Sequence, residues 1–181
     1  TYGSGVLFRF ESTTSILVSN FGNNEPVPAG YDLFTDALNG GWHHIACTYD
    51  GTTRMRRVYI DGVLKYSDTR TTDLVVPATA FLIGGAAYSN LNYYDGLLDE
   101  VMIYTRALKN NEIQRAMTLT LTAYTPLRAS TNLVARYSFE DMLNPGKDSG
   151  AQGYDLAAFG SVGTAASGKG GRALELSGSA A

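Results

Sequence analysis

The side chains that could do acid–base or metal chemistry in this chain of 181 residues are few, and they stand next to one another in the sequence. The two histidines are His43 and His44, and the single cysteine is Cys47. Adjacent residues of a strand point to opposite faces, so the two histidines cannot bind one metal ion from one face, and their spacing is not that of a zinc site. We therefore expect structural roles for the histidines, and we expect Cys47 to be a small buried residue in mid-strand.

The closest pairs of acidic residues are Asp99 with Glu100 and Glu140 with Asp141. Hydrolysis of a glycosidic bond needs two carboxyl groups that flank the substrate. On a strand, two adjacent carboxylates point to opposite faces, so neither pair can act together on one sugar. We predict that the protein is not an enzyme and that these carboxylates accept hydrogen bonds from turn amides.

The composition narrows the class of protein and the class of partner. Twelve tyrosines, 20 glycines and a hydrophobic content of 44% favour a folded all-β protein. A net charge of −3 without a basic cluster argues against nucleic acid and against an anionic membrane surface as partners. No apolar run approaches the roughly 18 residues of a membrane span. The chain has neither an initiator methionine nor a signal-peptide pattern, so we expect a mature or excised piece of a longer protein.

The elements that would position these side chains are clearest at residues 42–66. Residues 42–49 are aromatic, β-branched or small, which predicts a strand that ends at the turn dipeptide of residues 50–51. Residues 58–60 predict a second strand. Asp61-Gly62 then predicts a type I′ turn into residues 63–66, because both central positions of that turn need a positive φ. The pattern is that of a β-meander.

Weaker signals predict the remaining elements. One helix is expected at residues 108–117, with Asn110 or Asn111 as its cap and Glu112 in its first turn. A polar segment rich in threonine at residues 118–131 predicts a linker or an extended arm. Apolar runs predict strands at residues 6–10, 15–18, 31–34, 74–77, 81–84 and 97–104.

Three motifs carry a resemblance to a known family. Trp-His-His-Ile-Ala at residues 42–46, Val-Tyr-Ile-Asp-Gly at 58–62 and Tyr-Asp-Gly-Leu-Leu-Asp-Glu-Val-Met-Ile-Tyr at 94–104 resemble the laminin G-like family of concanavalin A-like domains. The resemblance implies an all-β fold, an antiparallel jelly-roll β-sandwich with one short helix near the end of the first block. It also implies an extracellular or cell-surface location and a structural role for His44, which matches the family's recurrent histidine.

The order of the matching segments is unusual. Residues 40–115 resemble the closing strands of such a domain, whereas residues 132–179 resemble its opening strands. We therefore divide the chain into middle and closing strands at residues 1–117, a linker or extended arm at 118–131, and opening strands at 132–181.

Three arrangements would explain this order. Residues 132–181 could begin the next module of a tandem array, or fold back on the same chain as in a circular permutation. They could also complete a neighbouring subunit by strand donation, which fills the open edges of an incomplete sheet. An arm of about 14 residues reaches about 45 Å when extended, which suffices for either folding back or donation.

The same resemblance implies two kinds of ligand. Calcium would bind near the rim of the sandwich through Asp99 and Asp148, with Asp141 as a third ligand, although the same carboxylates would serve equally as ordinary Asx turns. A glycan would need tyrosines beside polar groups. The loop that offers these contains Tyr88, Asn90, Asn92, Tyr93 and Tyr94. No other cofactor is expected.

These observations predict a non-catalytic extracellular protein with a structural or adhesive role. It would be a protomer or repeat of a surface or filamentous assembly, and its partners would be copies of itself, linked by strand complementation. The alternative is a carbohydrate-binding, lectin-like module of a larger modular protein, with glycans as partners.

Overall fold

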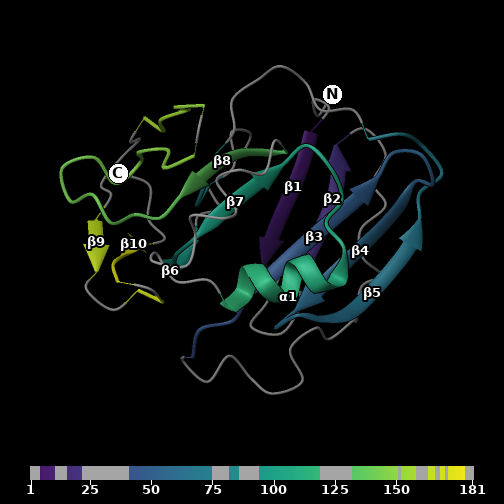
Figure 1. Cartoon of the computed structure of the whole chain (residues 1–181), viewed down its shortest axis with the longest axis horizontal. Helices are drawn as coiled ribbons and strands as arrows, with labels where there is room; N and C mark the ends of the chain where they lie inside the picture. The colour runs from purple at the N-terminus through teal and green to yellow at the C-terminus, as the bar shows by residue number, and fades with distance from the viewer. Residues whose placement is uncertain are drawn as a thin grey trace. The chain divides into compact units, whose positions relative to one another are not determined.

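The structure is a computed structural model in which almost every element is a β-strand (Figure 1). It describes residues 5–10, 16–21, 41–74, 82–85, 94–118, 132–150, 152–157, 163–165, 168–169 and 171–177. The strand pairs among these residues are antiparallel, and one short helix is present, so the predicted all-β class is confirmed. The chain divides into two compact units. Unit 1 is Thr1–Ala80 with Arg106–Thr118, and unit 2 is Phe81–Thr105 with Leu119–Ala181.

Unit 1 contains a hairpin, a three-stranded meander and the helix. β1 (Gly5–Phe10) pairs with β2 (Ile16–Phe21). The meander has the order β3-β4-β5, formed by β3 (Ile45–Asp50), β4 (Met55–Ile60) and β5 (Val63–Thr69). The strands predicted at residues 31–34 and 74–77, apart from Leu74, lie outside the described residues, as does the arm from residue 119 to residue 131.

The turn between β4 and β5 has the predicted geometry. Asp61 has a φ of 49° and Gly62 a φ of 74°, which confirms the type I′ turn. The Asp61 carboxylate also ties the turn to the start of β3. It accepts a bond from the His44 amide at 2.9 Å and lies 2.9 Å from Nδ1 of His43. Both histidines are thus tied to this turn.

Burial in the meander is greatest on its central strand, β4. Val58, Tyr59 and Ile60 are all buried, so both faces of β4 are covered. On β3 the buried residue is Thr48. Cys47 lies opposite Val58 in the ladder and is exposed, although Val58 is buried. The prediction that Cys47 is buried is therefore wrong.

The helix α1 (Asn110–Thr118) occurs where the sequence predicts it, but its start is stabilised differently. Asn110 is already helical, and the Lys109 amide donates to Glu112 Oε2 at 2.8 Å. Arg106 holds the same carboxylate with two bonds, of 2.8 and 2.6 Å. Glu112, rather than Asn110 or Asn111, supplies the acceptor that the free amide needs.

The described part of unit 2 contains five strands in two sheets. β6 (Asp95–Leu98), β10 (Ala173–Ser177) and β9 (Gly163–Ala165) form a sheet of order β6-β10-β9, and β7 (Val101–Tyr104) pairs with β8 (Leu133–Tyr137). The single strand predicted at residues 97–104 is wrong. Glu100 has a φ of 52°, a left-handed conformation that ends β6 and begins β7.

We expect Glu112→Gln to lower the free energy of unfolding by about 0.5–1 kcal/mol at pH 7, since the bonds are half-exposed and screened by solvent. The bonds from Arg106 and from the Lys109 amide lower the pKa of Glu112 to about 2, below its unfolded value. The stabilisation is therefore complete above the unfolded pKa of about 4.3 and disappears as the pH falls towards 2. Urea denaturation at several pH values measures it, with the exposed Glu175→Gln as control. A difference from wild type that did not shrink on acidification would contradict this assignment.

Candidate functional site

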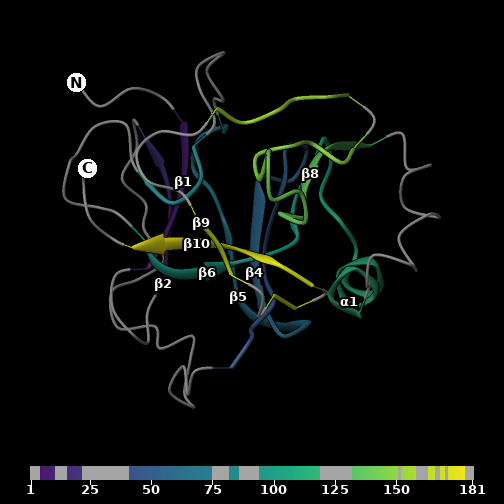
Figure 2. The same ribbon diagram turned by 90° about the vertical axis from the view of Figure 1, so that its left-hand side faces the viewer.

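The most elaborate polar arrangement among the described residues lies where two distant parts of the sequence meet in unit 2. We call residues 94–105 the central segment and residues 132–177 the C-terminal segment. β8 runs antiparallel to β7, with Met102 opposite Arg136 and Ile103 opposite Ala135 (Figure 1). β10 runs antiparallel to β6, with Leu98 opposite Leu174 (Figure 2). The contact between the two segments is called the junction below.

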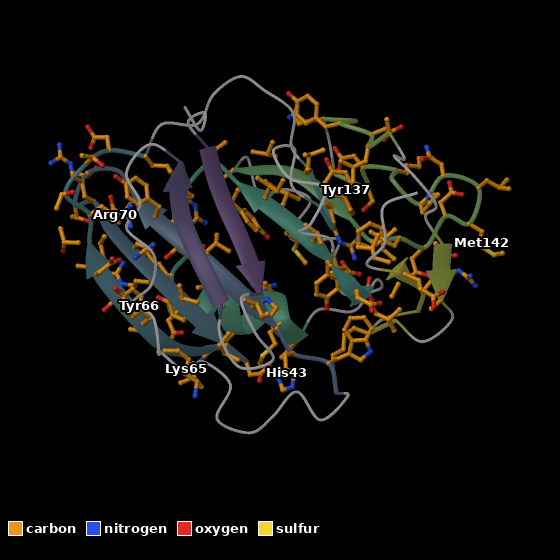
Figure 3. The ribbon with its side chains drawn as sticks, turned by 180° about the vertical axis from the view of Figure 1, so that it is seen from behind. His43, Lys65, Tyr66, Arg70, Tyr137 and Met142 are labelled. Carbon is orange, nitrogen blue, oxygen red and sulfur yellow. The ribbon has the colours of Figure 1, made fainter. Side chains whose placement is uncertain are left out.

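The apolar core of unit 2 is shared between these segments. Its fully buried members come from the C-terminal segment and are Ala135, Tyr137 (labelled in Figure 3), Phe139 and Leu174. The central segment contributes partly buried residues that pack against them, Leu98, Val101 and Ile103. Each large apolar side chain buried in this way contributes about 1.5–3 kcal/mol. Neither segment retains this core without the other.

An ion pair crosses the junction beside this core. The guanidinium of Arg136 donates from Nε to Glu100 Oε2 at 2.7 Å and from Nη2 to Glu100 Oε1 at 2.5 Å. The side chains are only 2% and 13% exposed. Burial raises the pKa of Glu100, the nearby charges of Asp99 and Glu140 add to the rise, and Arg136 opposes it. Because the cost of desolvation outweighs the attraction, the pair adds little to stability. Either side chain would nevertheless destabilise the fold if it were buried without the other.

Asp148 organises the C-terminal segment from within. Its Oδ1 accepts bonds from the amides of Arg136 at 2.9 Å and Gly150 at 2.7 Å, and its Oδ2 accepts one from the Tyr154 amide at 2.9 Å. Burial favours the neutral acid, but these amides outweigh it and lower the pKa of Asp148. The amide of Ser149 donates in turn to the Arg136 carbonyl at 2.7 Å. Asp148 and Ser149 therefore hold the amide and the carbonyl of Arg136, respectively.

The three carboxylates predicted as calcium ligands each bind backbone amides. Asp99 accepts from the Lys169 amide at 2.7 Å across the junction, and Asp141 accepts from the amides of Leu143 and Asn144. Within the described ranges, no group of three His, Cys, Asp or Glu side chains is placed to hold a metal ion. The structure brings Asp99, Arg136 and Glu140 near Glu100, but it does not gather Asp99, Asp141 and Asp148 into one metal site. Calcium binding stays a prediction.

The predicted glycan loop is described only at its end. Tyr88, Asn90, Asn92 and Tyr93 lie outside the described residues. Tyr94 is half-buried, its ring lies over Gly96, and its hydroxyl donates to the Leu97 carbonyl at 3.4 Å. Burial, with a smaller effect of Asp95, raises its pKa. Tyr94 therefore packs on its own strand.

A shallow hollow lies beside the junction. Its volume is about 230 Å³, below the roughly 300 Å³ at which ligand pockets begin. It is lined by Ser138, Phe139, Glu140, Asp141, Asn144, Pro145, Lys147 and Ser149. The hollow is too small to enclose a drug-sized ligand.

Arg136, which forms the ion pair across the junction, was not predicted from the sequence. The available signal was a single charge in the apolar run Leu-Val-Ala-Arg-Tyr of β8. A charge on a strand buried on both faces needs a partner, but nothing in the sequence identifies that partner as Glu100.

A known protein family matches more than half of the chain. Residues 2–114 match a laminin G-like family model described as the concanavalin A-like lectin/glucanases superfamily. A crystal structure of an S-layer domain-containing protein (residues 221–444) from Clostridium thermocellum is similar at 18% identity and a TM-score of 0.39. That match covers 64% of each chain. No curated protein matches. The one helix among the described residues is too short and too polar to cross a membrane.

We expect Asp148→Asn to lower the free energy of unfolding by about 1–3 kcal/mol at pH 7, because an amide NH₂ would face a backbone N–H. The effect should fade as the pH falls through the lowered pKa of Asp148, since the folded carboxylate is then protonated in the wild type as well. Urea denaturation across the acid range measures it. Asp141→Asn is the matched control, because one oxygen of Asp141 accepts the bonds from both the Leu143 and the Asn144 amides, and an amide oxygen can do the same. Equal losses in the two variants would refute the special role of Asp148.

Proposed function

We propose, from the premise that the chain belongs to the concanavalin A-like lectin/glucanases superfamily, that it is a non-catalytic structural module. The module would be part of an extracellular or cell-surface protein. Copies of the chain are linked through exchange of the C-terminal segment, which completes the sheets of a neighbouring copy.

One observation carries the proposal. β6 and β7 lie inside the matched range of residues 2–114, whereas their partners β10 and β8 lie outside it. The fully buried members of the shared core also come from outside that range. The central segment therefore depends on strands that the matched part of the domain does not contain. A complement supplied from elsewhere in the sequence can be supplied by another copy with the same contacts.

The connection between the segments supports exchange. Thirteen residues, 119–131, separate α1 from the C-terminal segment's first described residues. An extended chain of this length reaches about 45 Å, so it can return to its own central segment or cross to a neighbour. Folding back is favoured in dilute solution by the effective concentration of a tethered segment, which is in the millimolar range for short linkers. Head-to-tail exchange that does not close produces a filament.

The chemistry of the junction supports a non-catalytic role. Asp99, Glu100 and Asp148 are all engaged by protein groups, either backbone amides or the Arg136 guanidinium. A general acid or a nucleophile needs a carboxyl group that reaches the substrate. Asp99 and Glu100 instead bind the C-terminal segment, and Asp148 orders the backbone within that segment.

We expect the intact chain to form oligomers that grow with concentration, and a chain truncated after Thr131 to form none. Truncation removes both partner strands and uncovers Leu98, Val101 and Ile103, so the truncated chain should also unfold at lower urea. Light scattering and negative-stain microscopy measure assembly.

A separate peptide of residues 132–181 is the matched control, because it restores the missing strands without restoring the tether. It should cap the truncated chain as a one-to-one complex. A strictly monomeric intact chain at every concentration would overturn the assembly proposal. Saturable sugar binding by that monomer, lost in Tyr93→Ala and Tyr94→Ala, would support the lectin-like alternative.

A further inference from the structure

We infer that the Arg136–Glu100 pair is the selectivity element of the junction: it decides which copies of this chain accept one another's C-terminal segment. The inference rests on the proposed exchange and names the residues that control it. The partner it selects is a second copy, or a neighbouring module, with a carboxylate and a guanidinium at these two positions.

The contacts across the junction differ in how well they discriminate. The β7–β8 and β6–β10 ladders use backbone groups, which every strand offers, and the core contacts are apolar and tolerant of shape. The Arg136–Glu100 contact is instead an ion pair between side chains of the two segments. It is bidentate, and the planar guanidinium fork accepts a carboxylate in few orientations.

Burial turns this geometry into discrimination. Arg136 is 1% exposed, and its side chain is enclosed where the strand lies beside the core. A C-terminal segment placed against a central segment without a carboxylate at position 100 would bury this charge unpaired. An acceptor with Glu100 that received an uncharged or acidic residue would bury the carboxylate unpaired in the same way. Specific pairing commonly relies on such penalties against the wrong partner.

Each half of the pair is prepared within its own segment. On the C-terminal segment, Asp148 accepts the Arg136 N–H, and Ser149 donates to the Arg136 carbonyl from its amide and its hydroxyl. On the central segment, Asp99 accepts the Glu100 N–H at 2.8 Å. The backbone at Arg136 and the backbone at Glu100 are therefore each held by groups of their own segment.

The backbone conformation at Glu100 also favours a specific role for its side chain. Its φ of 52° lies in the left-handed region, where glycine is the least strained residue. A glycine there would make the same kink between β6 and β7. The glutamate accepts the strain and supplies the carboxylate that Arg136 requires.

The test mixes two single charge reversals, Glu100→Arg and Arg136→Glu, in the full-length chain. Each variant alone brings like charges together at every junction, so its assembly should weaken by about a hundredfold or more. In a one-to-one mixture, every junction between unlike copies pairs an arginine with a glutamate. Light scattering should then recover assembly to within about tenfold of the wild type, because the pair is restored in reversed or native orientation.

Three matched variants complete the design. Lys147→Glu changes the charge as Arg136→Glu does but at an exposed side chain, and it should assemble as the wild type does. The neutral variants Arg136→Met and Glu100→Gln repeat the mixing test without like-charge repulsion, in case the reversals fail to fold. The double reversal in one chain should assemble with itself and exclude the wild type.

The outcomes separate this inference from the function beneath it. If the wild type assembles but the single variants do so equally well, or if mixing restores nothing, the selectivity inference fails and strand exchange stands. If the wild type stays monomeric and only the double reversal regains stability, the pair closes the junction within one chain. In that case both the exchange and the inference fail.

Discussion

The buried ion pair between Arg136 and Glu100 is the constraint on which unit 2 depends. The left-handed backbone at Glu100 ends β6 and starts β7, so the two halves of one apolar run enter different sheets. The same residue then binds the guanidinium that β8 brings to β7. The kink, the charge and both ladders are therefore linked.

Acidic side chains in this protein share one physical task. Asp61 joins a turn to the start of a strand, Glu112 holds the first amide of the helix, Asp148 gathers three amides, and Asp99 reaches the Lys169 amide. A carboxylate offers several acceptor sites, so it can satisfy amides that strands and helices leave unpaired. Carboxylates used in this way are held in place by the backbone that they bind.

Local patterns were read correctly from the sequence because their causes are local. Asp61-Gly62 predicts its turn through the φ values that the two residues tolerate, and the helix follows from its run of helix-forming residues after Ala107. The wrong predictions concern features that are decided by contacts with neighbouring residues. Residues 97–104 look like one strand by hydrophobicity, yet a hydrogen bond from the Glu100 amide to Asp99 accompanies a break. Cys47 looks like a core residue, but its side chain is exposed although its cross-strand partner Val58 is buried.

The sequence by itself determined the all-β class, the laminin G-like family and most strand positions, since periodicity and turn dipeptides act over a few residues. Only the tertiary structure decided that β8 and β10 pair with β7 and β6, and that Arg136 meets Glu100 across 36 positions of sequence. The physical reason is that a buried charge requires a partner but does not name it. The partner is chosen by which strands share a core, and that choice is made by the whole chain.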